Sequence, residues 1–242
     1  MRIAIIAALP GELKPLVKGW QRVATNVSGT KKWILTRDAD TWIAVCAGMG
    51  AEAALRAFAS AVSDGPVDML LSVGWAGSLH PEVHPGTVHV PTVVIDAQTG
   101  EQFRLTEGKR QWRLVTTARV ADEAEKRRLA ATYPGAVLVD MEAAAVARLA
   151  EMHSIPLLCI KGVSDAAGAT LPDLNPFIDP RGKMQMARFL AYIAVRPRFW
   201  PSLLHLGKNS ARAANAMRDL ILQFMKEKNV EEFIRTRSIQ QS

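Results

Sequence analysis

The chain has 242 residues, of which 49% are hydrophobic and 22% are charged. This composition excludes an intrinsically disordered chain, and the length suits one large core. No apolar run approaches the roughly 18 residues that a membrane-spanning helix needs. The net charge of +7 is uneven, because residues 181–242 hold 12 Lys and Arg against 4 Asp and Glu.

Alternating apolar strands and helices run along the first 195 residues. We expect strands over residues 2–8, 32–37, 41–47, 67–73, 86–95, 112–117, 136–139 and 157–163. We expect helices over residues 51–62, 122–132, 141–152 and 182–195. This order predicts a three-layer α/β/α sandwich, and the polar hairpin around residues 38–40 favours a mixed central sheet over a purely parallel one.

The chain changes character after residue 195. We therefore divide it into a catalytic domain, residues 1–195, and a basic amphipathic C-terminal extension, residues 196–242, with a helix over 208–228. Such an extension either packs on the body or on a second subunit, or lies on a membrane surface as a peripheral contact. Nucleic-acid binding is not expected, because the extension has no recognised module.

Two isolated cysteines, Cys46 and Cys159, lie in apolar runs. They are expected to be buried free thiols in a reducing compartment, so the predicted location is cytoplasmic. The spacing of His80, His84 and His89 does not fit a metal site. We expect neither a metal nor another cofactor, with phosphate as an alternative co-substrate.

Three acidic residues follow apolar strands at corresponding places: Glu12, Glu142 and Asp165. A single acid at a strand end is ordinarily a helix cap or a solvated turn. Three of them at one edge of an α/β sheet favour a ligand cleft. Paired carboxylates in a partly dry cleft suit acid–base chemistry on a glycosidic bond, whose transition state is cationic at the sugar.

Five motifs occur in the order of a known family: the first strand with Glu12, then Gly48-Met49-Gly50, Gly74-Trp75-Ala76-Gly77, Asp140-Met141-Glu142-Ala143 and Ser164-Asp165. Over residues 1–195 the chain resembles the nucleoside phosphorylase superfamily, and most closely the methylthioadenosine/S-adenosylhomocysteine nucleosidases. The resemblance implies a homodimer or larger oligomer that binds a small-molecule nucleoside.

The resemblance also implies roles for single residues. Asp165 is the general acid that protonates the purine at N7, and Ser164 places it. Glu142 accepts hydrogen bonds from the ribose hydroxyls, and Met141 packs on the sugar. Glu12 holds the attacking water.

Further substrate contacts follow from the same resemblance. Gly74, Trp75 and Ala76 are expected to line the pocket beside the base and sugar, and Val120 matches the base-stacking segment. The chain departs from the family at Trp75, where a small hydroxyl residue is common, and at Gly168, where an acid is usual.

Phosphorylases of this superfamily place an arginine just before the Gly-rich loop, where this chain has Ser72 and Val73. Without that clamp, water is favoured as the nucleophile. The basic extension from Arg196 through Gly207 resembles instead the hopanoid-associated phosphorylase branch. That similarity implies release of adenine from a 5′-substituted adenosine that carries a lipid (adenosylhopane-type), in hopanoid biosynthesis.

Cleavage of a 5′-substituted adenosine is therefore the leading prediction. Two alternatives stay open. One is a phosphate-dependent purine nucleoside phosphorylase. The other is a catalytically silent nucleoside-binding protein, which Trp75 and Gly168 favour.

Overall fold

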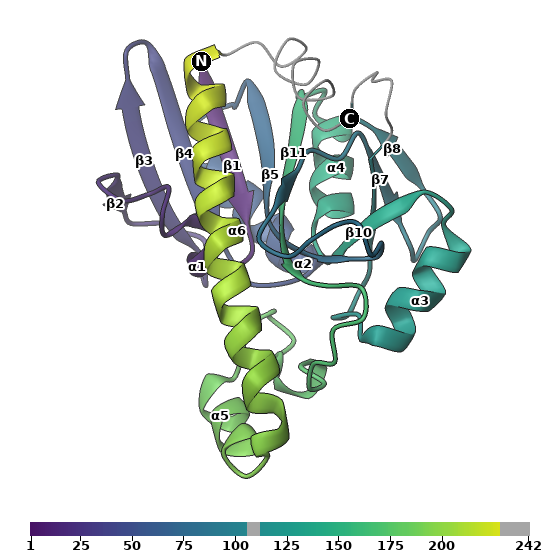
Figure 1. Ribbon diagram of the computed structural model, residues 1–242. Helices are drawn as coiled ribbons and strands as arrows, with labels where there is room; N and C mark the ends of the chain where they lie inside the picture. Colours follow the sequence, from purple (N-terminus) through teal and green to yellow (C-terminus); the bar gives the residue numbers. More distant parts are fainter. Residues whose placement is uncertain (106–111, 228–242) are drawn as a thin grey trace.

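A computed structural model describes residues 1–105 and 112–227. Within these residues, eleven strands form one sheet (Figure 1). The strands are β1 Arg2–Ala7, β2 Gln21–Val23, β3 Lys31–Arg37, β4 Asp40–Cys46, β5 Met69–Ser78, β6 Val88–His89, β7 Val93–Asp96, β8 Gln102–Arg104, β9 Arg113–Thr116, β10 Ala136–Asp140 and β11 Leu157–Asp165. The helices are α1 Pro10–Leu13, α2 Ala51–Val62, α3 Glu123–Thr132, α4 Ala143–Met152, α5 Met186–Ala194 and α6 Trp200–Glu227, with 3-10 turns η1 Asn175–Phe177 and η2 Pro197–Phe199.

The sheet is mixed. Its order is β2-β3-β4-β1-β5-β10-β9-β7-β8, and β11 pairs with β5 and β6. Strand β5 runs parallel to β1 and β11, while its last residues pair antiparallel with β10. Strand β5 therefore joins the ends of β1, β10 and β11, which are the ends that carry the three predicted carboxylates.

Helices cover both faces of the sheet. Helices α2 and α4 pack on one face in a cluster rich in alanine. On the other face, α1 and the second half of α6 pack against β1, β4, β5 and β11. The predicted three-layer α/β/α arrangement with a mixed central sheet is confirmed.

Helix α6 packs closely on the sheet. Gly162 in β11 leaves room for it, since a Cβ there would lie 2.9 Å from the Cβ of Ala213. Phe224 meets Trp42 of β4 edge to face, with ring centroids 6.2 Å apart. Residues 210–225 of the predicted extension thus pack on the body, while residues 228–242 lie outside the described part.

Several predicted elements differ from the structure. Strand β5 continues to Ser78, because Gly74 to Gly77 stay paired with β11 instead of forming a loop. The strand expected over 86–95 is interrupted and becomes β6 and β7. Helix α6 begins at Trp200 rather than at residue 208, since Pro201 is tolerated in a first helical turn.

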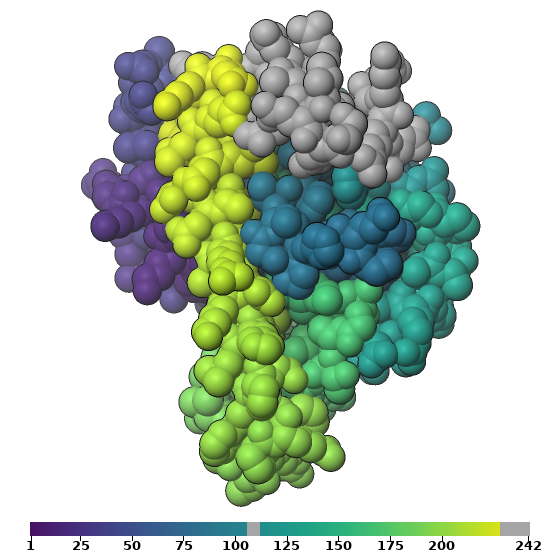
Figure 2. Space-filling model, in the orientation of Figure 1, coloured from purple at the N-terminus to yellow at the C-terminus, as the bar shows by residue number. Residues whose placement is uncertain are grey.

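The helix expected over 182–195 is also shorter. As α5 it spans Met186–Ala194 and lies outside the two main core clusters. It packs in a small separate cluster around Phe177, Phe189 and Ile193. Residues 174–206, which contain η1, α5, η2 and the start of α6, form a protrusion that we call the lobe (Figure 2).

Backbone contacts join the lobe to the body at Gly182. The amide of Met49 donates to the carbonyl of Gly182 (2.8 Å), and Gly182 has a positive φ of 74°. A Cβ at Gly182 would lie 2.0 Å from the carbonyl oxygen of Met49. Only glycine fits this approach without a backbone shift.

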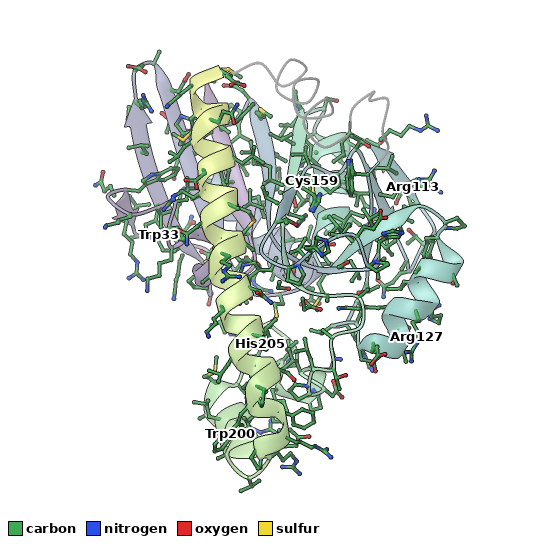
Figure 3. All side chains as sticks on the ribbon, in the orientation of Figure 1. Trp33, Arg113, Arg127, Cys159, Trp200 and His205 are labelled. Carbon is green, nitrogen blue, oxygen red and sulfur yellow. The ribbon has the colours of Figure 1, made fainter. Side chains whose placement is uncertain are left out.

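Cys46 and Cys159 are both buried free thiols, as predicted, and burial raises the pKa of each to about 12. Cys159 lies on β11 (Figure 3). None of the helices that the structure describes is long and apolar enough to cross a bilayer.

Because residues 210–225 pack on the sheet, we expect helix α6 to contribute to the stability of the folded domain. Phe224 is 2% exposed and Leu222, on the same helix, is 38% exposed. Phe224→Ala should lower the free energy of unfolding by about 3–5 kcal/mol, because it leaves a cavity under α6. Leu222→Ala is the matched control, with an expected change below about 1 kcal/mol. Equal urea midpoints for the two variants would contradict a role of α6 in the core.

Candidate active site

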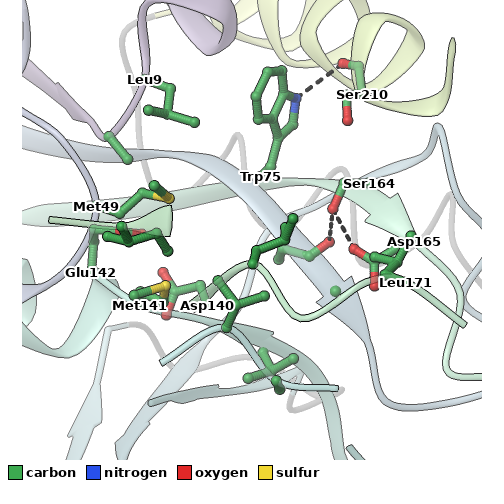
Figure 4. Close-up of a pocket in the computed structure, with 18 of the residues that line it drawn as sticks. Leu9, Met49, Trp75, Asp140, Met141, Glu142, Ser164, Asp165, Leu171 and Ser210 are labelled. Atoms are coloured by element: carbon green, nitrogen blue, oxygen red, sulfur yellow. Dashed lines mark hydrogen bonds between the residues drawn. The ribbon is translucent and has the colours of Figure 1, made fainter. Parts of the chain in front are cut away.

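A pocket of about 500 Å³ opens at the carboxyl ends of β1 and β11 and beside β10 (Figure 4). Glu12, Glu142 and Asp165 all line it. Of the other predicted site residues, Met141, Ser164, Trp75, Ala76 and Val120 line it as well. The structure thus brings together eight of the nine predicted residues, and the chemical role of each stays a prediction.

Glu12 is fixed by three backbone amides. Its Oε2 accepts from the amides of Ala8 (2.9 Å) and Leu9 (2.8 Å), and its Oε1 accepts from the amide of Trp75 (2.9 Å). Pro10 at the first position of α1 starts the short helix that turns Glu12 back toward its own strand. Burial raises the pKa of Glu12, and the amide hydrogen bonds oppose that rise.

Gly74, the ninth residue, lies behind this carboxylate rather than in the lining. A Cβ at Gly74 would come within 3.0 Å of Glu12 Oε1. Gly74 therefore leaves room for the Glu12 carboxylate and does not itself line the pocket.

Glu142 stands just before α4. Its Oε1 accepts from the amide of Gly50 (2.7 Å), the last residue of the Gly48-Met49-Gly50 motif. Burial, followed by the charge of Asp140, raises the pKa of Glu142 to about 8. At neutral pH this group is mostly protonated and can both donate and accept hydrogen bonds.

A buried ion pair lies beside Glu142. Lys161 Nζ is 2.8 Å from Asp140 Oδ2, and the two side chains are 1% and 0% exposed. The hydroxyl of Thr116 donates to Asp140 Oδ1 (2.7 Å), and the amide of Ala143 donates to Oδ2 (2.9 Å). Asp140 raises the pKa of Lys161, so the lysine stays charged despite its burial.

Asp165 also has a cationic partner. Lys126 of α3 donates to Asp165 Oδ2 and to the carbonyl of Ala166 (2.7 Å), and its side chain is 3% exposed. Ser164 donates to Asp165 Oδ1 (2.6 Å) and lies 3.2 Å from the carbonyl of Ala76. The side chain of Asp165 is therefore held between an ammonium and a hydroxyl.

Neither of these two lysines was among the site residues predicted from the sequence. Lys161 stands in an otherwise apolar strand, and a lysine in that context signals a buried partner. Lys126 offers no such signal, since it lies on a charged helix together with Arg127 and Arg128. Its approach to Asp165 depends on a fold that joins residues 39 positions apart.

Trp75 connects the pocket to helix α6. Its indole Nε1 donates to the carbonyl of Ser210 (3.0 Å), as Figure 4 shows. Gly11 makes room for the ring, because a Cβ there would lie 2.8 Å from Trp75 Cη2. Trp75 therefore closes the space between α1 and α6.

The backbone of Val120 is already engaged. Its amide donates to Asn175 Oδ1 (2.9 Å), and its carbonyl accepts from Asn175 Nδ2 (3.1 Å). Both polar atoms are thus occupied by η1 of the lobe. Its apolar side chain is therefore the part of Val120 that is available to the pocket.

Apolar side chains that the sequence analysis missed complete the wall. They come mostly from segments after β11 and include Leu9, Met49, Leu171, Leu174, Ile178, Met184, Met186 and Leu206. Arg119 also lines the pocket and is exposed. Among the residues that the structure describes, no group of three His, Cys, Asp or Glu is placed to hold a metal ion.

Comparison with known proteins agrees with this architecture. The model of the phosphorylase superfamily matches residues 2–120 and 114–195. The 5′-methylthioadenosine/S-adenosylhomocysteine nucleosidase of Buchnera aphidicola is 29% identical in an alignment of 138 residues, with a coverage of 44% of this chain and 55% of that protein. The match thus spans little more than half the length of that curated relative.

Solved structures share the fold at low identity. A 5′-methylthioadenosine nucleosidase of Arabidopsis thaliana superposes with a TM-score of 0.72 and 15% identity, over 95% of this chain and 96% of that one. The 5′-methylthioadenosine/S-adenosylhomocysteine nucleosidase of Helicobacter pylori gives 0.66 and 16%, over 92% and 98%. The futalosine hydrolase of the same organism gives 0.64 and 16%, over 90% and 97%.

The protonation of Glu142 predicts how stability depends on pH. Between the ordinary pKa of 4.5 and the raised value of about 8, the folded protein retains a proton that the unfolded chain has lost. Stability should therefore fall as pH rises through this window, by on the order of a few kcal/mol. Urea unfolding at several pH values measures the slope.

Glu142→Gln should flatten this slope, because an amide does not titrate. The raised pKa of Glu12 gives a slope of the same sign, so Glu12→Gln is the matched comparison. An unchanged pH slope in Glu142→Gln would show that Glu142 is ionised in the folded protein.

Proposed function

The chain belongs to the phosphorylase superfamily, and we propose that it cleaves the N-glycosidic bond of a purine nucleoside with water as the nucleophile. The observation that carries this proposal is one pocket lined by Glu12, Glu142 and Asp165, each with different partners. Relatives named as nucleosidases support the reaction class. The pocket itself indicates the substrate.

Asp165 and Lys126 serve the leaving base. Asp165 accepts a proton from the ammonium of Lys126, with which it is paired, and passes it to N7 of the purine. The bond between N9 and C1′ breaks, and its electron pair stays with the base. General acids of this kind contribute about 10²–10⁴-fold to rate.

Glu12 serves the nucleophile. Three amides hold its carboxylate in place, and its remaining lone pairs accept a hydrogen bond from water. As the water adds to C1′, Glu12 takes one of its protons. In total, one water molecule adds across the N-glycosidic bond. The Lys126–Asp165 pair gives one proton to the base, and Glu12 receives one proton from the water.

Glu142 and Met141 serve the sugar. A protonated Glu142 both donates to and accepts from ribose hydroxyls, and Met141 supplies an apolar contact beside it. The burial that raises the pKa of Glu142 also excludes water from this side of the sugar. Glu142 therefore orients the ribose without competing with Glu12 for the proton.

The pocket wall favours an apolar 5′ substituent. Leu171, Leu174, Ile178, Met184, Met186 and Leu206 offer no charged partner. A 5′-substituted adenosine that releases adenine fits this wall, and a lipid-linked adenosine of the adenosylhopane type is the longest substrate that we include. Trp75 adds apolar surface where the family commonly has a small hydroxyl residue.

A phosphate-dependent reaction is the second candidate, because Arg119 lines the pocket. This arginine is exposed and follows β9, whereas the family's phosphate-binding arginine precedes the Gly-rich loop. Water therefore remains the favoured nucleophile.

The first test is adenine release from a panel of adenosines. The panel runs from methylthioadenosine to adenosines with long apolar 5′ chains, each with and without phosphate. We expect release without phosphate and a lower KM for apolar chains, since the wall buries them. Strict dependence on phosphate would make the protein a phosphorylase. Tight binding without any adenine would indicate a silent nucleoside-binding protein instead.

Replacement of the acid tests its role. Asp165→Asn should lower turnover by more than about 100-fold, because the amide cannot supply a proton to N7, while nucleoside binding persists. Asp173→Asn is the matched control outside this pocket and should retain activity. Normal turnover in Asp165→Asn would assign the proton donor to another group.

A further inference from the structure

The lobe exposes large apolar side chains. Leu190 is 58% exposed, Val195 74%, Trp200 49% and Leu204 66%. Helix α5 has two apolar sides, because Phe189 and Ile193 are buried in the lobe's own cluster while Leu190 is not. No described part of the chain covers this second side, and it lies at the tip of a protrusion (Figures 2 and 3).

Only positive charge accompanies this apolar surface. Between Asp179 and Asp219 the sequence has eight Lys or Arg and no Asp or Glu. The five basic residues within the lobe are Arg181, Lys183, Arg188, Arg196 and Arg198, and in the described residues none forms an ion pair with a carboxylate.

We propose that the lobe docks on the surface of an anionic lipid bilayer, with Leu190, Val195, Trp200 and Leu204 inserted at the boundary between headgroups and acyl chains. Exposed apolar side chains together with basic ones that have no carboxylate partner are the combination that such surfaces bind. The basic side chains lie over phospholipid headgroups and attract the lobe to the membrane.

The side chain of Trp200 suits the boundary between headgroups and acyl chains. Its indole Nε1 already donates to the carbonyl of Ile193 (3.0 Å), so the exposed ring can leave water without an unsatisfied donor. Arg196 stacks on Tyr192, 3.8 Å from the ring centroid, and Arg198 lies 4.7 Å from the ring centroid of Phe199. These contacts hold two guanidinium groups beside apolar surface.

A second copy of the chain fits this surface less well. If the two lobes of a two-fold dimer met at the symmetry axis, the basic side chains of one lobe would face those of the other. The one acidic residue of the lobe, Asp179, accepts from the amides of Arg181 and Lys183 through Oδ1 and offers little compensation. Negative charge must therefore come from the partner, and phospholipid supplies it.

Docking would also serve the pocket, a consequence that rests on the proposed function. Met184, Met186 and Leu206 belong to the lobe and line the pocket. A docked lobe places this wall next to lipid, so a nucleoside with a long apolar 5′ chain can pass from the bilayer to the carboxylates. The lobe is then the entry side for lipid-linked substrates.

Vesicle flotation of the full chain tests docking directly. Vesicles of phosphatidylcholine are compared with vesicles that also contain phosphatidylglycerol, at low and high salt. We expect binding to the anionic vesicles, at least about tenfold weaker binding to the neutral ones, and loss of the difference at high salt. No binding to anionic vesicles at low salt would overturn the proposal.

Variants separate the lobe from the rest of the surface. Leu190→Asp with Leu204→Asp should abolish binding, and Arg188→Glu with Arg198→Glu should weaken it by about tenfold or more. Leu55→Asp on α2, where Leu55 is 49% exposed, and Lys18→Glu are matched controls. Equal loss in the controls would overturn the assignment to the lobe.

Two further measurements keep the proposals distinct. Brominated lipids should quench the fluorescence of the wild-type protein and not that of Trp200→Phe, and equal quenching in both would contradict insertion. Sedimentation without lipid detects the competing outcome, an oligomer that Leu204→Asp dissociates. Turnover of a soluble nucleoside should be unchanged in the lobe variants. The vesicle experiments therefore test membrane docking independently of the proposed activity.

Discussion

The buried pair of Asp140 and Lys161 is the interaction on which the site depends. It joins the end of β10 to the middle of β11, and Asp140 also accepts from Thr116 of β9 and from the start of α4. Removal of either partner would leave an uncompensated charge among apolar strands, which costs several kcal/mol. Burial is the main cause of the raised pKa of Glu142, and the same pair adjusts it, since Asp140 raises this pKa and Lys161 lowers it.

The three carboxyl groups of the pocket differ in the charged and hydrogen-bonding groups that surround them. Asp165 has an ammonium against it, Glu12 has three backbone amides, and Glu142 has one amide and a neighbouring acid. The environment of Glu142 favours its protonated form. Residues of one chemical type can thus hold a base, a water and a sugar in a single pocket.

The positions that could be predicted from the sequence are those that follow from the apolar periodicity of the strands. Glu12, Glu142 and Asp165 could be placed together because each follows a buried strand, and the ends of such strands meet in α/β sheets. Lys126 could not be found, because nothing in a charged helix indicates which basic residue turns inward. The exposed side of helix α5 could not be found either, because its two apolar sides look alike in sequence, although only one of them is covered.

The departure at Trp75 follows from helix α6. That helix crosses β11 at Gly162 and brings the carbonyl of Ser210 to the edge of the pocket, where the indole of Trp75 donates to it. A small hydroxyl residue at position 75 would leave a gap between Gly11 and α6, so the large ring is the part that fits. Because α6 runs from this contact into the lobe, one helix connects the partner of Trp75, Ser210, to Trp200 and Leu204 of the surface that we assign to the membrane.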